Sequence, residues 1–302
     1  MASADTDNTI KLWNVADGTL LIVLKGHSGD VFHVSFSPDG KFLASASLDN
    51  TVRLWNVKNG TLVQTFKGHS RSVYAVSFSP DGKILASAGD DRTVKLWRLT
   101  DQVFLQSLKG HLRSVRSVSF SPDGEVLASA GFDHRVILWS VEDGRMLKVL
   151  DRGNLNLVAV SFSPDGKLLA SSGGDAAVKL WNVADGTEVR TLEGHGSWVR
   201  DIDFSPDGKI VASAGFDRKV ILWNVADSTE VQTLEGHLGR VFSISFSPDG
   251  KLLASASEDG TVKLWNLTLD IEDFMELGCQ WLRDYIVTQN QDEEIQNICR
   301  DY

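Results

Sequence analysis

The 302-residue sequence contains very little cysteine and lacks any long apolar run. Its 2 cysteines, Cys279 and Cys299, both lie near the C-terminus, so we predict no disulfide framework. The N-terminal stretch MASADTDNTIKLW lacks the apolar core of a signal peptide, and no segment is long enough to predict a transmembrane helix. These absences favour a reducing compartment, and we expect a cytoplasmic protein with no membrane partner.

Basic residues are also fewer than acidic residues in this sequence. The sequence has 30 Lys and Arg against 40 Asp and Glu, which gives a net charge of −10 at pH 7. Binding to nucleic acid requires a basic face that displaces counterions from phosphates. The acidic balance therefore argues against a nucleic-acid partner, and also against adsorption to anionic membranes.

Proline is scarce, and its placement reveals a repeat. All 6 prolines occupy a recurring Ser-Pro-Asp-Gly motif, which suits a type I β-turn. A Leu-Trp pair recurs every 42 residues, with its tryptophans at Trp13, Trp55, Trp97, Trp139, Trp181, Trp223 and Trp265. A period of this length, with several short strands in each copy, is typical of a β-propeller.

Each copy contains the pattern of a four-stranded blade. Residues 241–246 alternate in polarity and are rich in β-branched and aromatic residues, which predicts a strand. Residues 252–256 and 261–265 predict two more strands, and complete copies add a fourth, as in residues 187–192. Four antiparallel strands form one propeller blade, and blades that pack only on their neighbours form a single domain. We therefore predict an all-β propeller over residues 1–268.

Four residue types keep fixed places within the copies: a His after Gly, a Ser in the second strand, an Asp in the next turn, and the Trp. The five complete sets, which we call the tetrads, are His27, Ser45, Asp49, Trp55; His69, Ser87, Asp91, Trp97; His111, Ser129, Asp133, Trp139; His195, Ser213, Asp217, Trp223; and His237, Ser255, Asp259, Trp265.

This pattern resembles the WD-repeat β-propeller family, whose blades begin with Gly-His and end in Trp-Asp. The resemblance covers roughly residues 1–266, and the near-identical copies look most like WD-repeat proteins of bacteria, especially cyanobacteria. One departure is that Asn, Arg or Ser follows each repeated Trp, never Asp. The resemblance implies that each tetrad is a structural hydrogen-bond relay rather than a catalytic site.

The copy that starts near residue 153 departs from the pattern. It has Arg152-Gly153 in place of Gly-His but retains Ser171, Asp175 and Trp181. Loss of one partner from a buried hydrogen-bond network costs about 1 kcal/mol or more. We expect this blade to be among the less stable ones.

Both ends of the repeat are incomplete. Residues 1–25 match the last three strands of a blade, and the copy that starts at Val241 has no clear fourth strand. We favour seven blade positions with an incomplete first blade, although six full blades are an alternative in which residues 19–25 supply the outer strand of the last one. The start within a blade favours a fragment of a longer protein, and unpaired strand edges suggest homodimerisation through the incomplete terminal blades.

The C-terminal residues 269–302 no longer follow the repeat. Apolar residues there fall at helical spacing, which predicts a helical tail packed on the terminal blade; they are Ile271, Phe274, Met275, Trp281, Leu282, Tyr285 and Ile286.

Ser, His and Asp are also the residue types of a hydrolase triad, but five identical active sites in one chain are implausible. We find no other nucleophile pattern, phosphate-binding glycine loop or metal-ligand spacing. The sequence therefore predicts a protein that is not an enzyme and that has no cofactor and no metal site.

Recognition residues are expected where the copies differ from one another. The variable positions carry aromatic and Arg side chains, the types that dominate protein–protein hot spots. Our candidates for partner binding are Trp198, Arg200, Arg240, Phe32, Tyr74, Arg116, Phe242, Leu48, Phe132 and Phe216. The family resemblance implies that they lie near the mouth of the central channel. We expect a non-catalytic scaffold that binds a protein or peptide. The alternative is a truncated sensor module of a larger signalling NTPase, kinase or protease-like protein.

Overall fold

The computed structural model describes residues 1–151, 153 and 155–268. The predicted helical tail and Arg152 lie outside these residues. Every regular element of the described chain is a β-strand, and the strands are short, mostly five or six residues. Strands of this length fit between the closely spaced Ser-Pro-Asp-Gly turns and Asp-containing turns of the sequence.

The strands form seven groups in chain order. The first four groups are β1 (Ala2–Ala4), β2 (Thr9–Trp13), β3 (Leu20–Lys25); β4 (Val31–Phe36), β5 (Phe42–Ser47), β6 (Thr51–Asn56), β7 (Leu62–Lys67); β8 (Val73–Phe78), β9 (Ile84–Gly89), β10 (Thr93–Arg98), β11 (Val103–Lys109); and β12 (Val115–Phe120), β13 (Val126–Gly131), β14 (Arg135–Ser140), β15 (Met146–Asp151). The last three are β16 (Leu157–Phe162), β17 (Leu168–Gly173), β18 (Ala177–Asn182), β19 (Glu188–Glu193); β20 (Val199–Phe204), β21 (Ile210–Gly215), β22 (Val220–Asn224), β23 (Glu230–Leu234); and β24 (Val241–Phe246), β25 (Leu252–Ser257), β26 (Val262–Asn266).

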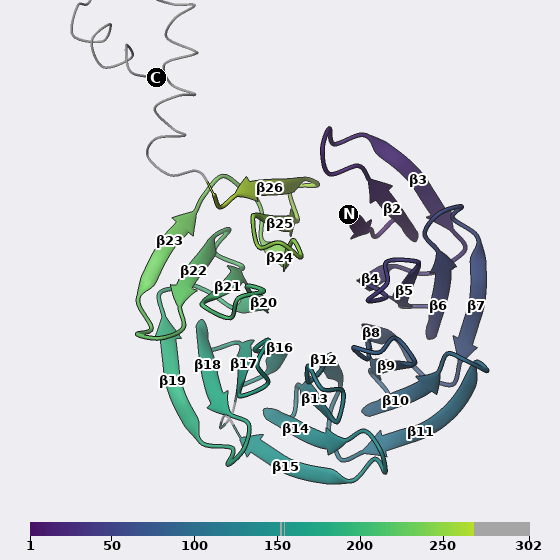
Figure 1. Cartoon of the computed structure of the whole chain (residues 1–302), viewed down its shortest axis with the longest axis horizontal. Helices are drawn as coiled ribbons and strands as arrows, with labels where there is room; N and C mark the ends of the chain where they lie inside the picture. The colour runs from purple at the N-terminus through teal and green to yellow at the C-terminus, as the bar shows by residue number, and fades with distance from the viewer. Residues whose placement is uncertain (152, 154, 269–302) are drawn as a thin grey trace, which may run out of the picture.

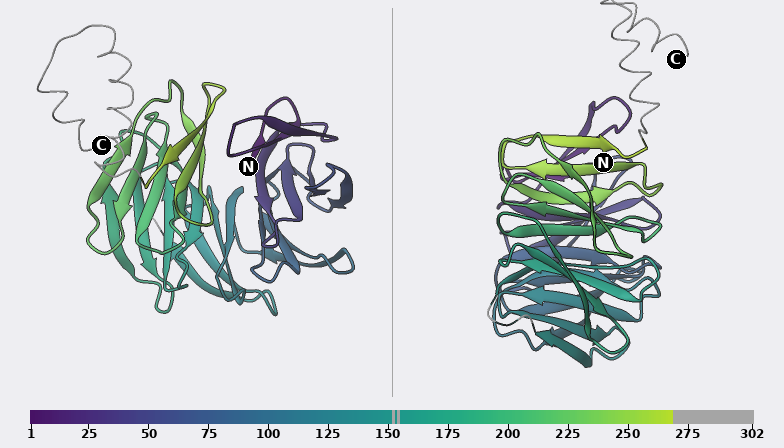
Figure 2. Two further views of the ribbon diagram at one scale, coloured as in Figure 1. Left: turned by 45° about the horizontal axis from the view of Figure 1, so that its top comes forward. Right: turned by 90° about the vertical axis from the view of Figure 1, so that its left-hand side faces the viewer.

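Each group is one antiparallel sheet in which neighbours in sequence are neighbours in space. Five sheets have four strands, and the first and last have three. The sheets stand radially around a central axis, each with its first strand innermost (Figure 1), and form a short cylinder when viewed from the side (Figure 2). The chain is therefore an all-β propeller with seven blades, as the sequence predicts.

The alternative arrangement with six full blades is wrong. It requires residues 19–25 to pair with the last sheet, but β3 pairs with β2 in the first sheet, with Thr9 opposite Lys25 and Trp13 opposite Leu20. The first sheet therefore keeps its own outer strand, and the described part of residues 1–268 supplies no outer strand to the last sheet.

The Ser-Pro-Asp-Gly turns join the first and second strands of each blade. In the turn at Ser37, the Gly40 N–H donates to the Ser37 carbonyl at 2.8 Å, and the Ser37 hydroxyl donates to Asp39 at 2.7 Å. Gly40 has a φ of 68°, a conformation that glycine adopts without steric cost. This local geometry explains why the motif tolerates so little change between copies.

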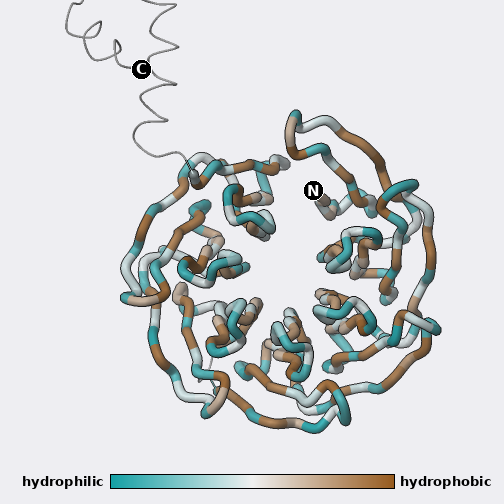
Figure 3. Tube along the Cα trace, viewed as in Figure 1, coloured by the Kyte–Doolittle hydropathy of each residue, from teal (hydrophilic) through white to brown (hydrophobic). Residues whose placement is uncertain are grey.

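Neighbouring blades pack through one repeated interface. One face of the second sheet, with Val52, Leu54 and Phe66, packs on the opposite face of the third, with Phe78 and Trp97. Corresponding residues form the other junctions. Apolar segments accordingly recur along the strands of every blade (Figure 3). Burial of these side chains supplies most of the driving force that holds the blades together.

A β-bulge interrupts the inner pair of strands in six blades. In the second sheet Val31 pairs with Ser47 and His33 with Ala46, so Phe32 is an extra residue without an opposite partner. The same shift occurs at Tyr74, Arg116, Val158, Arg200 and Phe242. A bulge of this kind bends the strand locally and redirects the side chain of the extra residue.

Candidate protein-binding surface

The bulges present six of the variable residues at one end of the inner strands. Five of these six, all except Val158, are among the residues predicted to bind a partner. Phe32 and Phe242 are 38% and 40% exposed, so they do not belong to the core. Tyr74, Arg116 and Arg200 are half-buried. The bulge therefore places large side chains beside the channel without disturbing the buried ladder below them.

The first cluster of these side chains surrounds Arg116. Its guanidinium carbon lies 3.7 Å from the ring centroid of Tyr74 and 4.0 Å from that of Phe132. Phe32 extends the cluster, with its ring centroid 5.1 Å from that of Tyr74. We call these four residues the Arg116 cluster. Contacts between a cation and an aromatic face contribute about 0.5–2 kcal/mol, so the cluster fixes Arg116 in place.

A second cluster lies on the sixth and seventh blades. The Trp198 and Phe216 rings are stacked with an interplanar angle of 10°, and Phe216 meets Phe242 edge-on at 5.7 Å between centroids. The Arg240 guanidinium lies 4.9 Å from the centroid of Phe216. We call these four residues the Trp198 cluster. Half-buried aromatic rings with a neighbouring guanidinium form the kind of surface that binds peptide side chains.

Arg200 is the extra residue of the bulge in β20 and belongs to neither cluster. Burial lowers the pKa of Arg200, and the positive charge of Arg116 lowers it further, while Asp201 opposes both effects. Burial also lowers the pKa of His33 to about 4, and the charge of Arg200 contributes. His33 is therefore uncharged at neutral pH, and Arg116, Arg200 and Asp201 lie close enough to influence one another's charge.

Leu48 is the one predicted binding residue outside these contacts. It is 46% exposed in the turn between β5 and β6 and belongs to neither cluster. The ten predicted residues thus divide into two clusters of four, a central Arg200 and a separate Leu48.

The tetrads lie deeper in the blades. In the second blade the Trp55 indole N–H donates to the Ser45 hydroxyl at 2.8 Å, and Ser45 Oγ lies 2.7 Å from His27 Nε2. His27 Nδ1 lies 2.8 Å from the Asp49 carboxylate. The other four sets form the same contacts. Because both ring nitrogens of each His are engaged and the Ser is buried, the arrangement joins three parts of a blade and leaves no accessible nucleophile.

Two carboxylates on the inner strand of the sixth blade have a role that the sequence pattern does not reveal. Asp201 accepts hydrogen bonds from the Ser243 hydroxyl at 2.8 Å and the Ile244 N–H at 2.9 Å, and Asp203 accepts one from the Phe246 N–H at 2.9 Å. Both carboxylates therefore join the sixth blade to the seventh. Their signal in the sequence is that no other copy has an acid at either place, and that Asp203 replaces the Ser of the other copies.

Burial raises the pKa of both carboxylates. The pKa of Asp203 rises to about 7 because of burial and the nearby Asp201, although the Phe246 hydrogen bond opposes the rise. The pKa of Asp201 is also raised by burial. Within residues 1–151, 153 and 155–268, no group of three or more His, Cys, Asp or Glu is placed to hold a metal ion. No helix in that same part of the chain is long and apolar enough to cross a membrane.

Radial four-stranded sheets, a repeated interface and a relay in each complete tetrad define a β-propeller of the repeat-built class. The family model described as "WD domain, G-beta repeat" matches six consecutive segments, residues 18–56, 60–98, 102–140, 144–182, 186–224 and 228–266. The chain belongs to the WD-repeat family. Propellers of this family are typically scaffolds for protein interaction rather than catalysts.

Individual relatives match over about one repeat. Ribosome assembly protein 4 of Chaetomium thermophilum is 49% identical over 43 residues, which is 14% of this chain and 8% of that protein. The F-box-like/WD repeat-containing protein TBL1X of Mus musculus is 45% identical over 42 residues, again 14% of this chain and 8% of that protein. The WD40 repeat-containing protein HOS15 of Arabidopsis thaliana is 41% identical over 44 residues, 15% and 7% of the two chains.

The matched segments therefore span less than a tenth of these relatives. They show the repeat and nothing of the activity of the whole proteins. The resemblance to bacterial, and especially cyanobacterial, WD-repeat proteins stays a prediction.

Proposed function

We propose that this protein is a non-catalytic scaffold that binds a protein or peptide segment at the channel mouth. The binding surface consists of the Arg116 cluster, the Trp198 cluster and Arg200. The observation that carries the proposal is the bulge in each inner strand, which directs the residues that differ most between copies to one end of the channel.

The chemistry of this surface suits a peptide. The aromatic rings offer broad apolar contact, and their rigid side chains lose little conformational entropy when a ligand binds. Arg240 is exposed, and Arg200 and Arg116 retain positive charge beside the channel, so polar groups of a ligand can be oriented there. Hot-spot residues of this kind typically contribute about 2 kcal/mol or more each.

The test is a triple substitution of Trp198, Arg200 and Arg240 by Ala. Peptides selected from a random display library against the unmodified protein should bind the triple variant at least about 100-fold more weakly, since two lost hot spots account for that factor. Fluorescence anisotropy measures the affinities, and circular dichroism with thermal melting shows whether the variant is folded.

A matched control removes similar groups from the opposite end and outer edge of the blades. Arg98 is exposed and pairs with Asp101 at 2.9 Å, and Phe104 is 47% exposed on the outer strand of its blade. Substitution of Arg98 and Phe104 by Ala should leave peptide affinity unchanged. Equal affinity of the folded triple variant and the unmodified protein for every selected peptide would contradict the proposal.

The alternative is that the same surface is a sensor within a larger signalling protein. The curated relatives are many times longer than their matched segments, which is compatible with such an arrangement. The DNA upstream of Met1 distinguishes the two: an open reading frame that continues into a kinase, NTPase or protease-like domain favours the sensor.

A further inference from the structure

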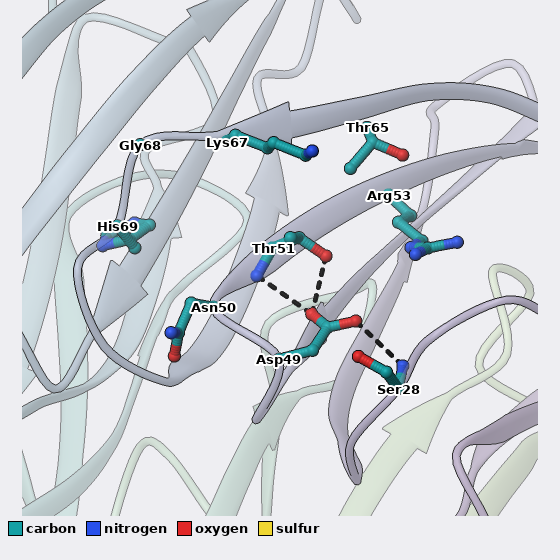
Figure 4. A pocket seen from close by; sticks show the side chains of 9 residues that line it. All are labelled: Ser28, Asp49, Asn50, Thr51, Arg53, Thr65, Lys67, Gly68 and His69. Atoms are coloured by element: carbon teal, nitrogen blue, oxygen red, sulfur yellow. Dashed lines mark hydrogen bonds between the residues drawn. The ribbon is translucent and has the colours of Figure 1, made fainter.

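A polar cavity of about 400 Å³ lies outside the channel, between the β6–β7 pair and the loop that leads into the third blade (Figure 4). Four side chains of its wall stand on one face of the second sheet. Thr51 is opposite Lys67, and Arg53 is opposite Thr65, in the antiparallel register. Directly opposed residues and residues two apart share a face, so these four form one compact patch. The size is within the range of pockets that bind small ligands.

The one carboxylate in the cavity is already fully engaged. Asp49 Oδ2 accepts from the Ser28 N–H at 3.1 Å and lies 2.8 Å from His27 Nδ1. Asp49 Oδ1 accepts from the Thr51 N–H at 3.0 Å and the Thr51 hydroxyl at 2.6 Å. Burial favours the neutral acid, but hydrogen bonds from Thr51, His27 and Ser28 outweigh it and lower the pKa of Asp49 to about 2. Asp49 therefore belongs to the blade and is not a counter-ion for Arg53 or Lys67.

The two cations of the cavity have no counter-ion of their own. Arg53 Nε is buried without a hydrogen-bond partner. Among the described residues, neither Arg53 nor Lys67 forms an ion pair. A buried donor without a partner costs free energy, and a ligand that accepts from this guanidinium recovers it.

The other blades show how unusual this arrangement is. In the fifth blade, Lys179 occupies the place of Arg53 and forms an ion pair with Glu188 at 2.6 Å. The second blade has Leu62 where Glu188 stands, so the equivalent ion pair cannot form there. At the place of Lys67, the fourth, fifth and sixth blades carry acids, namely Asp151, Glu193 and Glu235.

The first and third blades also carry cations at both places, Lys11 with Lys25 and Lys95 with Lys109. Lys11 forms an ion pair with Asp5 at 2.6 Å, so the third blade is the nearer counterpart. There, however, Lys95 lies 3.4 Å from the Ser107 hydroxyl and 5.4 Å from the centroid of the Phe104 ring. Lys95 of the third blade therefore has polar and aromatic partners within its own blade, whereas Arg53 Nε has no hydrogen-bond partner.

We propose that this cavity binds a phosphate group. The planar guanidinium of Arg53 suits bidentate recognition of phosphate oxygens, Lys67 adds a point charge, and the Thr65 hydroxyl adds a donor. Figure 4 shows Thr65 and Lys67 along one strand beside Thr51 and Arg53 on the next. The site is separate from the channel mouth and does not depend on the proposed function. Inorganic phosphate and a phosphorylated side chain offer the same oxygens.

The experiment is calorimetric titration of the full chain with inorganic phosphate and with phosphoserine at pH 7 and low ionic strength. We expect saturable binding at one site. The test variant is Arg53→Ile with Lys67→Glu, which places at both positions residues that fold in other copies, as at Ile137 and Glu193. Affinity should fall at least about tenfold, because a charge-assisted hydrogen bond contributes about 1.5–3 kcal/mol.

The matched control is Lys95→Ile with Lys109→Glu, which changes the net charge by the same amount one blade away. The control should keep its affinity for phosphate. Tighter binding of phosphoserine than of inorganic phosphate assigns the site to a phosphorylated chain, and the reverse assigns it to the free anion. Absence of saturable binding, equal loss in both double variants, or acetate binding as tight as phosphate would overturn the proposal.

Discussion

The inner blades and the last blade are built from the same repeat but differ in how well their side chains are buried. Leu138 in the fourth blade is 2% exposed, whereas the equivalent Leu264 in the last blade is 39% exposed. Val262 and Ala254 are also partly exposed, although their counterparts in the inner blades are buried. The sequence of the copy is nearly constant, so burial here depends on the neighbouring blade and not on the residue itself.

The terminal blades also differ in their hydrogen bonding. The last blade has three strands within the part of the chain that the structure describes, and the carboxylates of Asp201 and Asp203 join it to the sixth. At another junction the corresponding contact comes from a neutral side chain, the Ser117 hydroxyl, which accepts from the Val160 N–H at 3.2 Å. The homodimer that the sequence suggests through the terminal blades stays a prediction.

The largest expected difference between the two regions concerns the repeated leucine. Leu138→Ala should lower the free energy of unfolding by about 2–5 kcal/mol, because it leaves a cavity between two blades. Leu264→Ala should cost less than about 1 kcal/mol, since this side chain is already partly solvated. Urea unfolding followed by tryptophan fluorescence measures both. Equal losses would show that the last blade is as well packed as the inner ones.

A second difference depends on pH and concerns Asp203. The pKa of Asp203 is raised in the folded protein to about 7. Its favourable contribution to the free energy of unfolding is therefore complete below about pH 4 and is lost as the pH rises through about 7. Between pH 5 and 8 the free energy of unfolding should therefore fall by about 2–3 kcal/mol on account of this group.

The matched variant is Asp203→Asn, whose side-chain carbonyl can still accept from the Phe246 N–H. It should remove most of this pH dependence, as urea unfolding at pH 5 and pH 8 measures. Arg200 and Asp201 stay in place in the variant, so any pH dependence of the free energy of unfolding that they cause persists. An unchanged slope would assign the pH dependence to those neighbours.

The smallest expected difference concerns the serine that accepts from the Trp. Ser129→Ala leaves the Trp139 indole N–H and His111 Nε2 without a partner in a buried site, at a cost of about 1–3 kcal/mol. In the first blade Trp13 donates to Ser3 at 2.9 Å, but the site is only partly buried and no tetrad His is present. Ser3→Ala should therefore cost about 0.5–1 kcal/mol. A cost for Ser3→Ala that matches or exceeds that of Ser129→Ala would contradict the comparison.

The architecture could be predicted from the sequence because its signals are local and repeated. The Ser-Pro-Asp-Gly turn, the alternation of strand residues and the spacing of Trp13 and Trp55 each specify part of a blade, and near-identical copies make each signal unambiguous. The end of the repeat after Asn266 was equally evident, since nothing after that residue follows the pattern.

The candidate surface could be predicted only in part. Variability between copies identifies Arg116 and Trp198, but it does not reveal the bulge that redirects Arg116 or the ring stacking of Trp198 with Phe216, since both depend on the register between strands. The role of Asp203 depends on contact with the next blade, a relation that no local pattern contains. Arg53 shows the same limit, because its lack of a counter-ion is evident only once strand register places Leu62 near it.

The bulges have a consequence for the engineering of this protein. The extra residue of each bulge takes no part in the pairing of its strand, so its identity can change without altering the ladder on either side. Five of the six such positions, all except the buried Val158, are at least partly exposed at the same end of the inner strands. These positions can be randomised to build a combinatorial library, from which variants with new binding specificities are selected while the rest of the scaffold stays unchanged.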